Sequence, residues 1–135
     1  MPITLVDPDG LPKIDLYHQV AVATGTRHVH VAGQVASDAT GATVGIGDLA
    51  AQTAQAMRNV VTALAAVGAT PDDVVRLTVY VVGWTPDKMP ALVDGLTRAG
   101  FTTGSGALPP ASMFGVETLD VPEHLVEIEA TAIMD

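Results

Sequence analysis

The residues best suited to acid–base chemistry lie in an apolar segment near the C-terminus, LVEIEATAIM (residues 125–134). Glu127 and Glu129 alternate with apolar residues, so in a strand both carboxylates project from one face. A carboxylate within an apolar strand is costly unless it is hydrogen-bonded or exposed to solvent. The pair therefore fits two roles: ordinary solvated or ion-paired groups, or groups that position water and accept a proton beside a cleft. The pattern alone leaves both open.

Histidines offer a second kind of chemistry. His28 and His30 are two residues apart in HVHVAGQVA (28–36), whose alternation is typical of a half-buried strand, so both imidazoles share one face. A metal would need a third ligand from His18, His124 or a carboxylate, and none of these stands at a recognised spacing. We interpret the two histidines as a solvated strand face and expect no metal.

Neither a nucleotide loop nor a serine nucleophile is indicated. The glycines of GATVGIGD (41–48) precede a helix start but lack the Gly-Lys-Ser/Thr ending of a phosphate-binding loop, which favours a mobile surface loop. Ser112 follows two prolines at the start of a strand, in LPPASMFGVE (108–117), without a nucleophile elbow. Nothing in the spacing supports a triad of Ser112 with a histidine and an acid.

The elements that position these residues can be predicted from hydrophobic periodicity. A helix is expected over 48–68, with Asp48 as its N-cap and Gly68 at its C-terminal end, and a second helix from Thr85 to about Ala99. Alternating apolar residues predict strands, the first two forming a hairpin, at 19–24, 28–36, 75–84, about 111–118 and about 124–133.

The resulting order, ββαβαββ, predicts an α+β fold in which two helices pack on one face of a mixed sheet. The other face of the sheet is expected to be apolar and to pack against a partner subunit. The chain has 135 residues and no linker, so we expect one domain over 1–135. With 48% hydrophobic and only 16% charged residues, it carries more apolar surface than one small core can bury, which predicts a homo-oligomer.

Charge and cysteine content exclude several classes of partner and of site chemistry. The net charge is −9 and the six basic residues are scattered, so there is no basic footprint for a nucleic acid or an anionic membrane surface. No cysteine is present, which removes disulfides and thiolate chemistry and fits a reducing compartment. No signal peptide and no apolar run of membrane-spanning length is visible. A cytoplasmic protein with a small-molecule substrate or ligand is therefore expected.

Several segments, taken in order, resemble the Rid family, also called YjgF/YER057c/UK114. They cover most of the chain, from Tyr17 to Ala132, and are YHQVAV (17–22), VHVAGQVA (29–36), QTAQAMRNVVTALAAVGAT with PDDVVRLTVYV (52–81), PPAS (109–112) and LVEIEATA (125–132). The resemblance implies a chorismate-mutase-like fold and a homotrimer with clefts between subunits. It also implies hydrolysis of reactive 2-imino or 2-enamino acids to 2-keto acids and ammonia, without a metal or organic cofactor.

The resemblance further implies which residues form the site. Tyr17 matches the family's catalytic tyrosine. Glu127, rather than Glu129, matches the glutamate that orients the attacking water. These two residues are the expected catalytic pair.

Substrate-binding residues follow from the same resemblance. Gly33 and Gln34 match the family's SGQ-like strand, and Met113 and Phe114 would line the cleft. Ser112 departs from the pattern, because deaminating members have an arginine there that binds the substrate carboxylate. A guanidinium makes two parallel charged hydrogen bonds, whereas serine offers one neutral hydroxyl, and the matching segment contains no other arginine.

Two functions from different classes follow from this departure. The first is a hydrolase that acts on an imine, enamine or related intermediate without an α-carboxylate, and that deaminates ordinary 2-imino acids weakly or not at all. The second is a non-catalytic trimer that binds a small molecule or stabilises other proteins. The ribonuclease activity reported for some relatives is disfavoured by the acidity of the chain.

Overall fold

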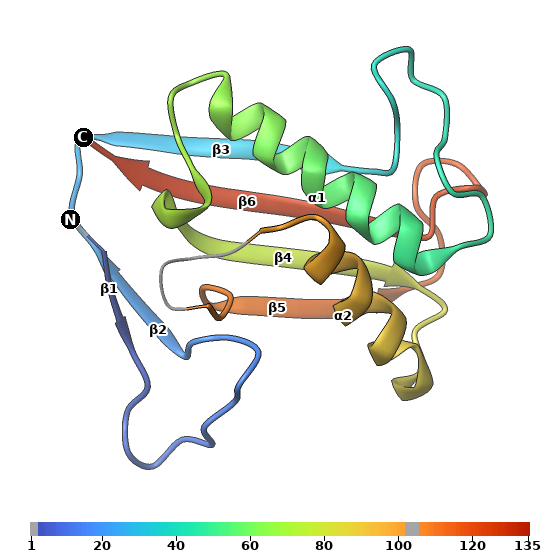
Figure 1. The fold of residues 1–135 in the computed structure, drawn as a ribbon. Coiled ribbons are helices and arrows are strands. Elements are labelled where there is room, and N and C mark those ends of the chain that lie inside the picture. Colours follow the sequence, from blue (N-terminus) through green and yellow to red (C-terminus); the bar gives the residue numbers. More distant parts are fainter. Residues whose placement is uncertain (1–2, 102–105) are drawn as a thin grey trace.

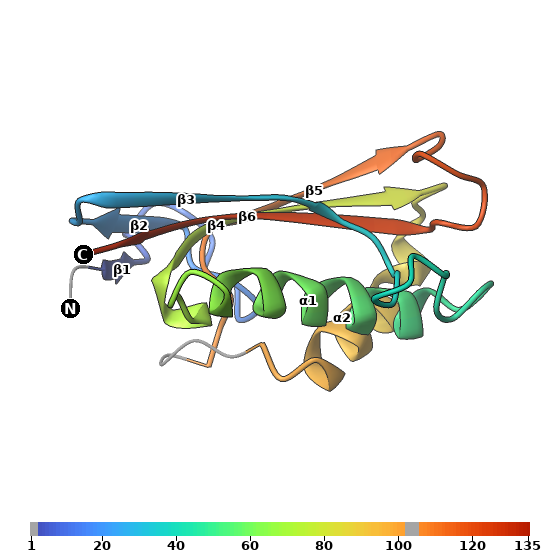
Figure 2. The ribbon, with the colours of Figure 1, turned by 90° about the horizontal axis from the view of Figure 1, so that it is seen from above.

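Two α-helices cover one face of a four-stranded sheet, as Figures 1 and 2 show. The structure, a computed structural model, describes residues 3–101 and 106–135. The helices are α1 (Leu49–Ala65) and α2 (Met89–Arg98), and short 3₁₀ turns at Pro71–Asp73 and Pro86–Lys88 precede β4 and α2. The strands are β1 (Ile3–Val6), β2 (Val20–Ala23), β3 (Arg27–Gln34), β4 (Val74–Val82), β5 (Ala111–Val116) and β6 (Val126–Met134).

The sheet is mixed, as the sequence predicts. Its strand order is β3-β6-β4-β5, in which β4 and β5 run parallel and the other neighbours run antiparallel. The parallel pair exists because α2 carries the chain from the end of β4 back to the start of β5. β5 is consequently an edge strand, and β4 and β6 are central.

The predicted pairing of the first two strands is wrong. β2 pairs with β1, which the sequence did not indicate, while β3 pairs with β6. The connection between β2 and β3 passes so close to the end of β6 that a Cβ on Gly25 would lie 2.8 Å from the carbonyl oxygen of Met134. This contact places β3 alongside β6 and leaves β2 to pair with the N-terminal segment.

Both helices form where their periodicity predicts. The carboxylate of Asp48 accepts a hydrogen bond of 3.0 Å from the backbone N–H of Ala51, which caps α1. The inward stripe of α1 includes Met57, Val60 and Leu64, all fully buried. The two helices pack closely where Gly95 of α2 meets α1. Neither of these two helices, within the described ranges, is long and apolar enough to cross a membrane.

The face of the sheet opposite the helices, here called the open face, is polar rather than apolar. Alternation along the strands directs Leu77, Val79, Val81 and Ile128 toward the helices, where they form the core. The opposite set of positions carries mostly polar side chains: His28, His30, Arg76, Thr78, Tyr80, Ser112, Glu127, Glu129 and Thr131. The expectation of an apolar second face was therefore wrong, because the alternating positions of β4 and β6 on this face are polar or amphipathic except for Val82 and Ile133.

Several exposed apolar side chains lie in the N-terminal part of the chain. They are Val6, Leu11, Ile14, Val20 and Val22, of which Val22 is the most exposed at 57%. Three of these side chains lie on the β1–β2 pair, which projects beside the main sheet (Figure 1). The open face also exposes one large apolar side chain, Phe114 at 51%, so both surfaces leave apolar area uncovered by the chain.

Candidate functional site

Tyr17 is held beside the start of β5 by backbone hydrogen bonds. The N–H of His18 donates to the carbonyl of Leu108 at 2.9 Å, and the N–H of Leu108 donates to the carbonyl of Leu16 at 2.8 Å. Pro109 and Pro110 follow directly, and the carbonyl of Pro110 accepts from the N–H of Leu77 at 3.0 Å to begin the pairing with β4. Residues far apart in sequence are thereby brought to one edge of the sheet.

An apolar pocket of about 410 Å³ lies at this edge, between β5 and α2. Because β5 is an edge strand, residues from both of its faces border the cavity. The sequence-predicted residues Tyr17, Ser112, Met113 and Phe114 all line it, with Leu16, Val79, Met89, Leu92, Leu96, Leu108 and Ala111. None of these lining residues is charged; Tyr17 and Ser112 are the polar ones, and the Ser112 hydroxyl is turned to the open face, where Arg76 donates a hydrogen bond to it.

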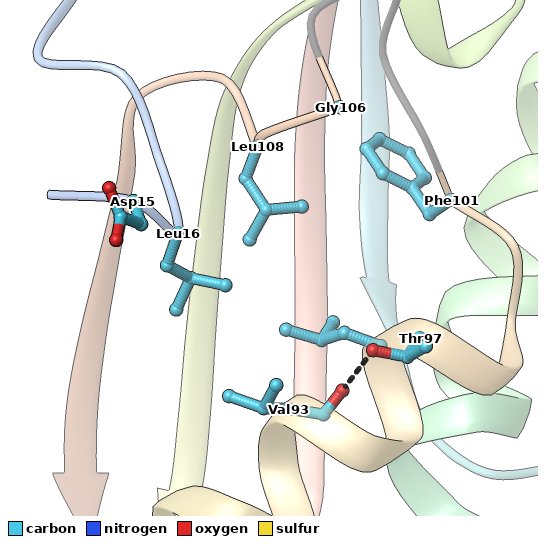
Figure 3. Close-up of a pocket in the computed structure, with 8 residues that line it drawn as sticks. Asp15, Leu16, Val93, Thr97, Phe101, Gly106 and Leu108 are labelled. Atoms are coloured by element: carbon cyan, nitrogen blue, oxygen red, sulfur yellow. Dashed lines mark hydrogen bonds between the residues drawn. The ribbon is translucent and has the colours of Figure 1, made fainter.

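A smaller hollow of about 220 Å³ adjoins the apolar pocket and shares Leu16, Leu96 and Leu108 with it (Figure 3). Asp15 is its charged residue, and the hydroxyl of Thr97 donates to the carbonyl of Val93 at 2.9 Å. None of the site residues predicted from sequence lines this second hollow.

Glu127 lies on the open face of the sheet, against the backbone of Gly33. A β-bulge between Val31 and Gln34 places Gly33 opposite Glu127, and a Cβ on Gly33 would lie 2.1 Å from Glu127 Oε2. Only a residue without a side chain leaves the carboxylate in this position. Gln34 donates from its side chain to the carbonyl of Ala32 at 3.0 Å, so its amide is turned back onto β3.

Within one protomer, Glu127 is separated from the apolar pocket. Tyr80 on β4 pairs with Glu127 on one side and with Phe114 on the other, and the Tyr80 and Phe114 rings stack with centroids 5.9 Å apart. Two strand spacings amount to about 10 Å, which exceeds the reach of one hydrogen bond. Glu127 and Gly33 therefore form one part of the predicted site, and the residues of the apolar pocket form another.

Tyr80 itself was not singled out from the sequence. Its hydroxyl donates to Glu129 Oε1 at 2.9 Å. This hydrogen bond, followed by burial and by the negative charges of Glu129 and Glu127, raises the pKa of the Tyr80 phenol above its ordinary value of 10.0. The signal in the sequence was the alternation of Arg76, Thr78 and Tyr80 in VRLTVYV, which places all three side chains on the open face.

An arginine does reach Ser112, from the neighbouring strand. Arg76 Nη2 donates to Ser112 Oγ at 2.5 Å. The segment around Ser112 contains no arginine, but the parallel register pairs Thr78 with Ser112 and so brings Arg76 of β4 beside it. Arg76 does not line the apolar pocket; its guanidinium lies over the open face.

The histidines lie in three separate places. His28 and His30 are exposed on the open face, opposite Ile133 and Thr131 of β6. In the described part of the chain, no three or more His, Asp or Glu side chains gather in a way that could hold a metal ion. His18 pairs with Asp7 at 2.8 Å near the β1–β2 pair.

His124 forms a hydrogen bond with the glycine-containing loop over residues 41–48. Its Nδ1 lies 2.5 Å from Asp120 Oδ1, and its Nε2 lies 3.2 Å from the Thr43 hydroxyl. The hydrogen bond with His124 holds the pKa of Asp120 below its ordinary value of 3.8. The buried Gln52 adds a second connection, since its amide donates to the carbonyl of Gly45 in this loop at 3.2 Å and to the carbonyl of Glu123 at 2.8 Å.

Comparison with known proteins identifies relatives of this fold. Residues 10–134 match the family model described as Endoribonuclease L-PSP. YyfB of Yersinia pestis, a Rid-family protein of unknown function, is 39% identical, with a TM-score of 0.88 and coverage of 99% of this chain and 100% of that chain. Rv2704 of Mycobacterium tuberculosis, from the YjgF/YER057c/UK114 family, is 30% identical, with a TM-score of 0.63 and coverage of 98% and 99%.

More distant structures carry other descriptions. A putative endoribonuclease from Thermotoga maritima is 27% identical, with a TM-score of 0.68 and coverage of 98% of each chain. A search of curated proteins found no match. The relatives thus agree on the fold, while the activities in their descriptions range from endoribonuclease to unknown.

Proposed function

Because the chain belongs to the Rid (YjgF/YER057c/UK114) family, we propose that it is a hydrolase that deaminates a reactive imine or enamine without a metal or organic cofactor. The observation that carries this proposal is the convergence of Tyr17, Ser112, Met113 and Phe114 on one apolar pocket. An apolar pocket with few, well-placed polar groups is the usual form of a small-molecule site.

The substrate is expected to lack an α-carboxylate. Among the residues that line the apolar pocket, a carboxylate would meet the phenol of Tyr17 but no cation, because Arg76 lies over the open face and is bonded to the Ser112 hydroxyl there. A charged, bidentate arginine contact in such a cleft contributes about 2–5 kcal/mol that serine cannot replace. The pocket therefore favours a neutral imine or enamine with an aliphatic or aromatic side chain.

The proposed chemistry needs one proton acceptor and one proton donor. Water attacks the imine carbon as Glu127 accepts its proton, and the C=N electron pair moves to the nitrogen, which is protonated. Glu127 returns this proton to the amino nitrogen of the resulting carbinolamine, and the hydroxyl proton replaces the one that Tyr17 supplied; the C–N bond then breaks, and ammonia and a carbonyl compound leave. Tyr17 would donate a hydrogen bond to the nitrogen and assist its protonation.

A homotrimer would bring the two parts of the site together. In one protomer Glu127 lies across β4 from the apolar pocket, so the pocket alone holds no proton acceptor. We infer that clefts form between subunits, where the Gly33–Glu127 element of one protomer faces the apolar pocket of the next. The exposed apolar side chains around Val20 and Val22 support such an assembly, because association would bury them.

A second candidate is a non-catalytic trimer that binds a small molecule or stabilises other proteins. The separation of Glu127 from the apolar pocket favours it, because without the proposed assembly the pocket can bind but holds no proton acceptor. RNA cleavage, which the description of some relatives names, is not favoured. The chain carries a net charge of −9, and phosphate contacts need clustered lysines or arginines.

A matched pair of substrates tests the proposal. An amine oxidase acting on 3-methylbutylamine makes a neutral imine, and an amino-acid oxidase acting on leucine makes the same side chain with an α-carboxylate. Imine loss is followed by competition with semicarbazide. The protein should accelerate loss of the neutral imine and have little effect on the 2-imino acid.

Two results would count against the proposal. Equal acceleration of the 2-imino acid would show that a cation, Arg76 being the nearest to Ser112, reaches the pocket. No acceleration of either imine by the intact assembly would favour the binding function instead.

A further inference from the structure

Asp7 joins the end of β1 to the segment that carries Tyr17. Its Oδ2 lies 2.8 Å from His18 Nδ1, and its Oδ1 accepts a hydrogen bond of 3.0 Å from the backbone N–H of Gln19. The bond from Gln19, followed by the bond with His18, lowers the pKa of Asp7 below its ordinary value of 3.8, so the carboxylate is ionised at neutral pH. One carboxylate therefore holds both residues that directly follow Tyr17.

Tyr17 and His18 project to opposite sides of this segment. The backbone is extended where Tyr17 forms an isolated bridge with Leu108, and neighbouring side chains of an extended backbone point in opposite directions. Accordingly, Tyr17 lines the apolar pocket, whereas His18 is not among the lining residues and contacts Asp7. Asp7 thus holds the segment from the side opposite to the phenol.

The hydrogen bonds to Leu108 do not by themselves fix the direction of the phenol. Both of them, from His18 N–H and to the carbonyl of Leu16, join the segment to the same residue, so the segment can pivot about this one contact. The contact with Asp7 opposes such a rotation. Only 17% of the His18 side chain and 22% of that of Asp7 is exposed, so water competes little for this contact.

We propose that Asp7 is a positioning residue, which holds the Tyr17 phenol in the apolar pocket through its bonds with His18 and Gln19. The inference rests on the proposed function, in which Tyr17 donates to the nitrogen of the substrate. The phenol must lie within hydrogen-bond reach of that nitrogen, and a displacement of about 1 Å can cost roughly 10²-fold in rate. Asp7 does not line the pocket, so it acts on the reaction only through Tyr17.

A purely structural role of Asp7 predicts a different outcome. In that case Asp7 would only close the loop between β1 and β2, whose pairing ends at Val6 and Val20. Its loss would then lower the free energy of unfolding but leave the surroundings of the phenol, and the kcat of the folded protein, unchanged. Measurements on folded and assembled protein therefore separate the two roles.

Fluorine NMR detects the surroundings of the phenol without a catalytic assay. Labelling with 3-fluorotyrosine gives two resonances, because the chain contains two tyrosines, Tyr17 and Tyr80, and Tyr17→Phe assigns them. Asp7→Ala should shift or broaden the resonance of Tyr17 and leave that of Tyr80 unchanged. Asp9→Ala removes an exposed carboxylate two residues further along the chain and should change neither.

Hydrolysis of the neutral imine from 3-methylbutylamine, by unlabelled protein, measures the consequence for the rate. Asp7→Ala should lower kcat about tenfold with little change in KM, because the phenol acts in the reaction step. Asp7→Asn keeps an oxygen that can accept from the Gln19 N–H and should recover most of the rate, while Asp9→Ala should match the parent. In a Tyr17→Phe background, Asp7→Ala should cost nothing further.

The proposal is overturned if the Tyr17 resonance of folded Asp7→Ala is that of the parent, or if Asp7→Ala loses the same tenfold in the Tyr17→Phe background. If Asp7→Ala does not fold, His18→Phe, which removes the ring nitrogen that contacts Asp7, must displace the Tyr17 resonance instead. Absence of imine hydrolysis in the parent would refute the proposed function alone, and the fluorine resonances would then decide the role of Asp7.

Discussion

Replacing Gly33 by alanine should lower turnover by displacing Glu127 rather than removing it. A Cβ at this position would lie 2.1 Å from Oε2, 2.7 Å from Cδ and 2.9 Å from Cγ of Glu127. Non-bonded carbon and oxygen atoms sit at about 3.5 Å or more, so the carboxylate must move by about 1 Å or more. Gly33 does not have a positive φ, so the backbone itself accepts alanine.

The size of the effect follows from this displacement. A misplacement of about 1 Å in a catalytic arrangement can cost roughly 10²-fold in rate. The free energy of unfolding should change by about 1 kcal/mol or less, because the group that moves is the end of a flexible, partly exposed side chain. Gly33→Ala should therefore fold and assemble like the parent and still turn over about 10²-fold more slowly.

A double-mutant cycle, measured with the neutral imine as substrate, makes the test specific for the contact between Gly33 and Glu127. We expect kcat/KM to fall about 10²-fold in Gly33→Ala and about 10²–10⁴-fold in Glu127→Gln. The double variant should be no slower than Glu127→Gln alone, because both changes act on one carboxylate. If Gly33→Ala turns over like the parent, or if the two losses add, the position of Glu127 against Gly33 does not govern the rate.

Three further outcomes are expected. Gly95→Ala should lower the free energy of unfolding by about 1–3 kcal/mol, because its Cβ would lie 2.5 Å from Thr53 Cβ and 2.6 Å from the Ala50 carbonyl oxygen. Chemical denaturation measures this change. An unchanged denaturation midpoint would mean that α1 and α2 can move apart at this contact without cost. Because the hydrogen bond with His124 lowers the pKa of Asp120 in the fold, its stabilisation is present above the unfolded value of 3.8 and is lost as the pH falls through the folded value. Asp120→Asn should therefore lower Tm near pH 7 and match the parent in strong acid, and a deficit that persists in acid would contradict the pairing. Light scattering should give three times the mass of one chain, and a stable monomer at micromolar concentration would remove the intersubunit site.

Local patterns were sufficient to predict most elements of this fold. The stripe from Thr53 to Leu64 and the cap at Asp48 predicted α1, and the alternation in residues 75–84 predicted β4. Strand pairing depends on contacts between distant segments, so the hairpin between β2 and β3 was wrong. The open face was also wrongly expected to be apolar, because the hydrophobic average of the chain concealed regularly spaced polar residues.

The candidate site, too, could be predicted from the sequence only in part. Family resemblance selected Tyr17, Ser112, Met113 and Phe114, and the structure brings these four to one pocket. Arg76 could not be connected to Ser112 without the register of the parallel β4–β5 pair, which local sequence does not specify. Whether Glu127 acts on that pocket remains a prediction, because it depends on an assembly of several chains.

Hydrolysis of the neutral imine from 3-methylbutylamine tests the central claim most directly, with parent, Glu127→Gln and Glu117→Gln compared as intact assemblies. Glu117 is exposed after β5 and serves as a charge-matched control. We predict that the parent and Glu117→Gln accelerate imine loss equally, and that Glu127→Gln is slower by about 10²–10⁴-fold, because it lacks the proton acceptor. Turnover of Glu127→Gln at the rate of the parent would contradict the proposed mechanism.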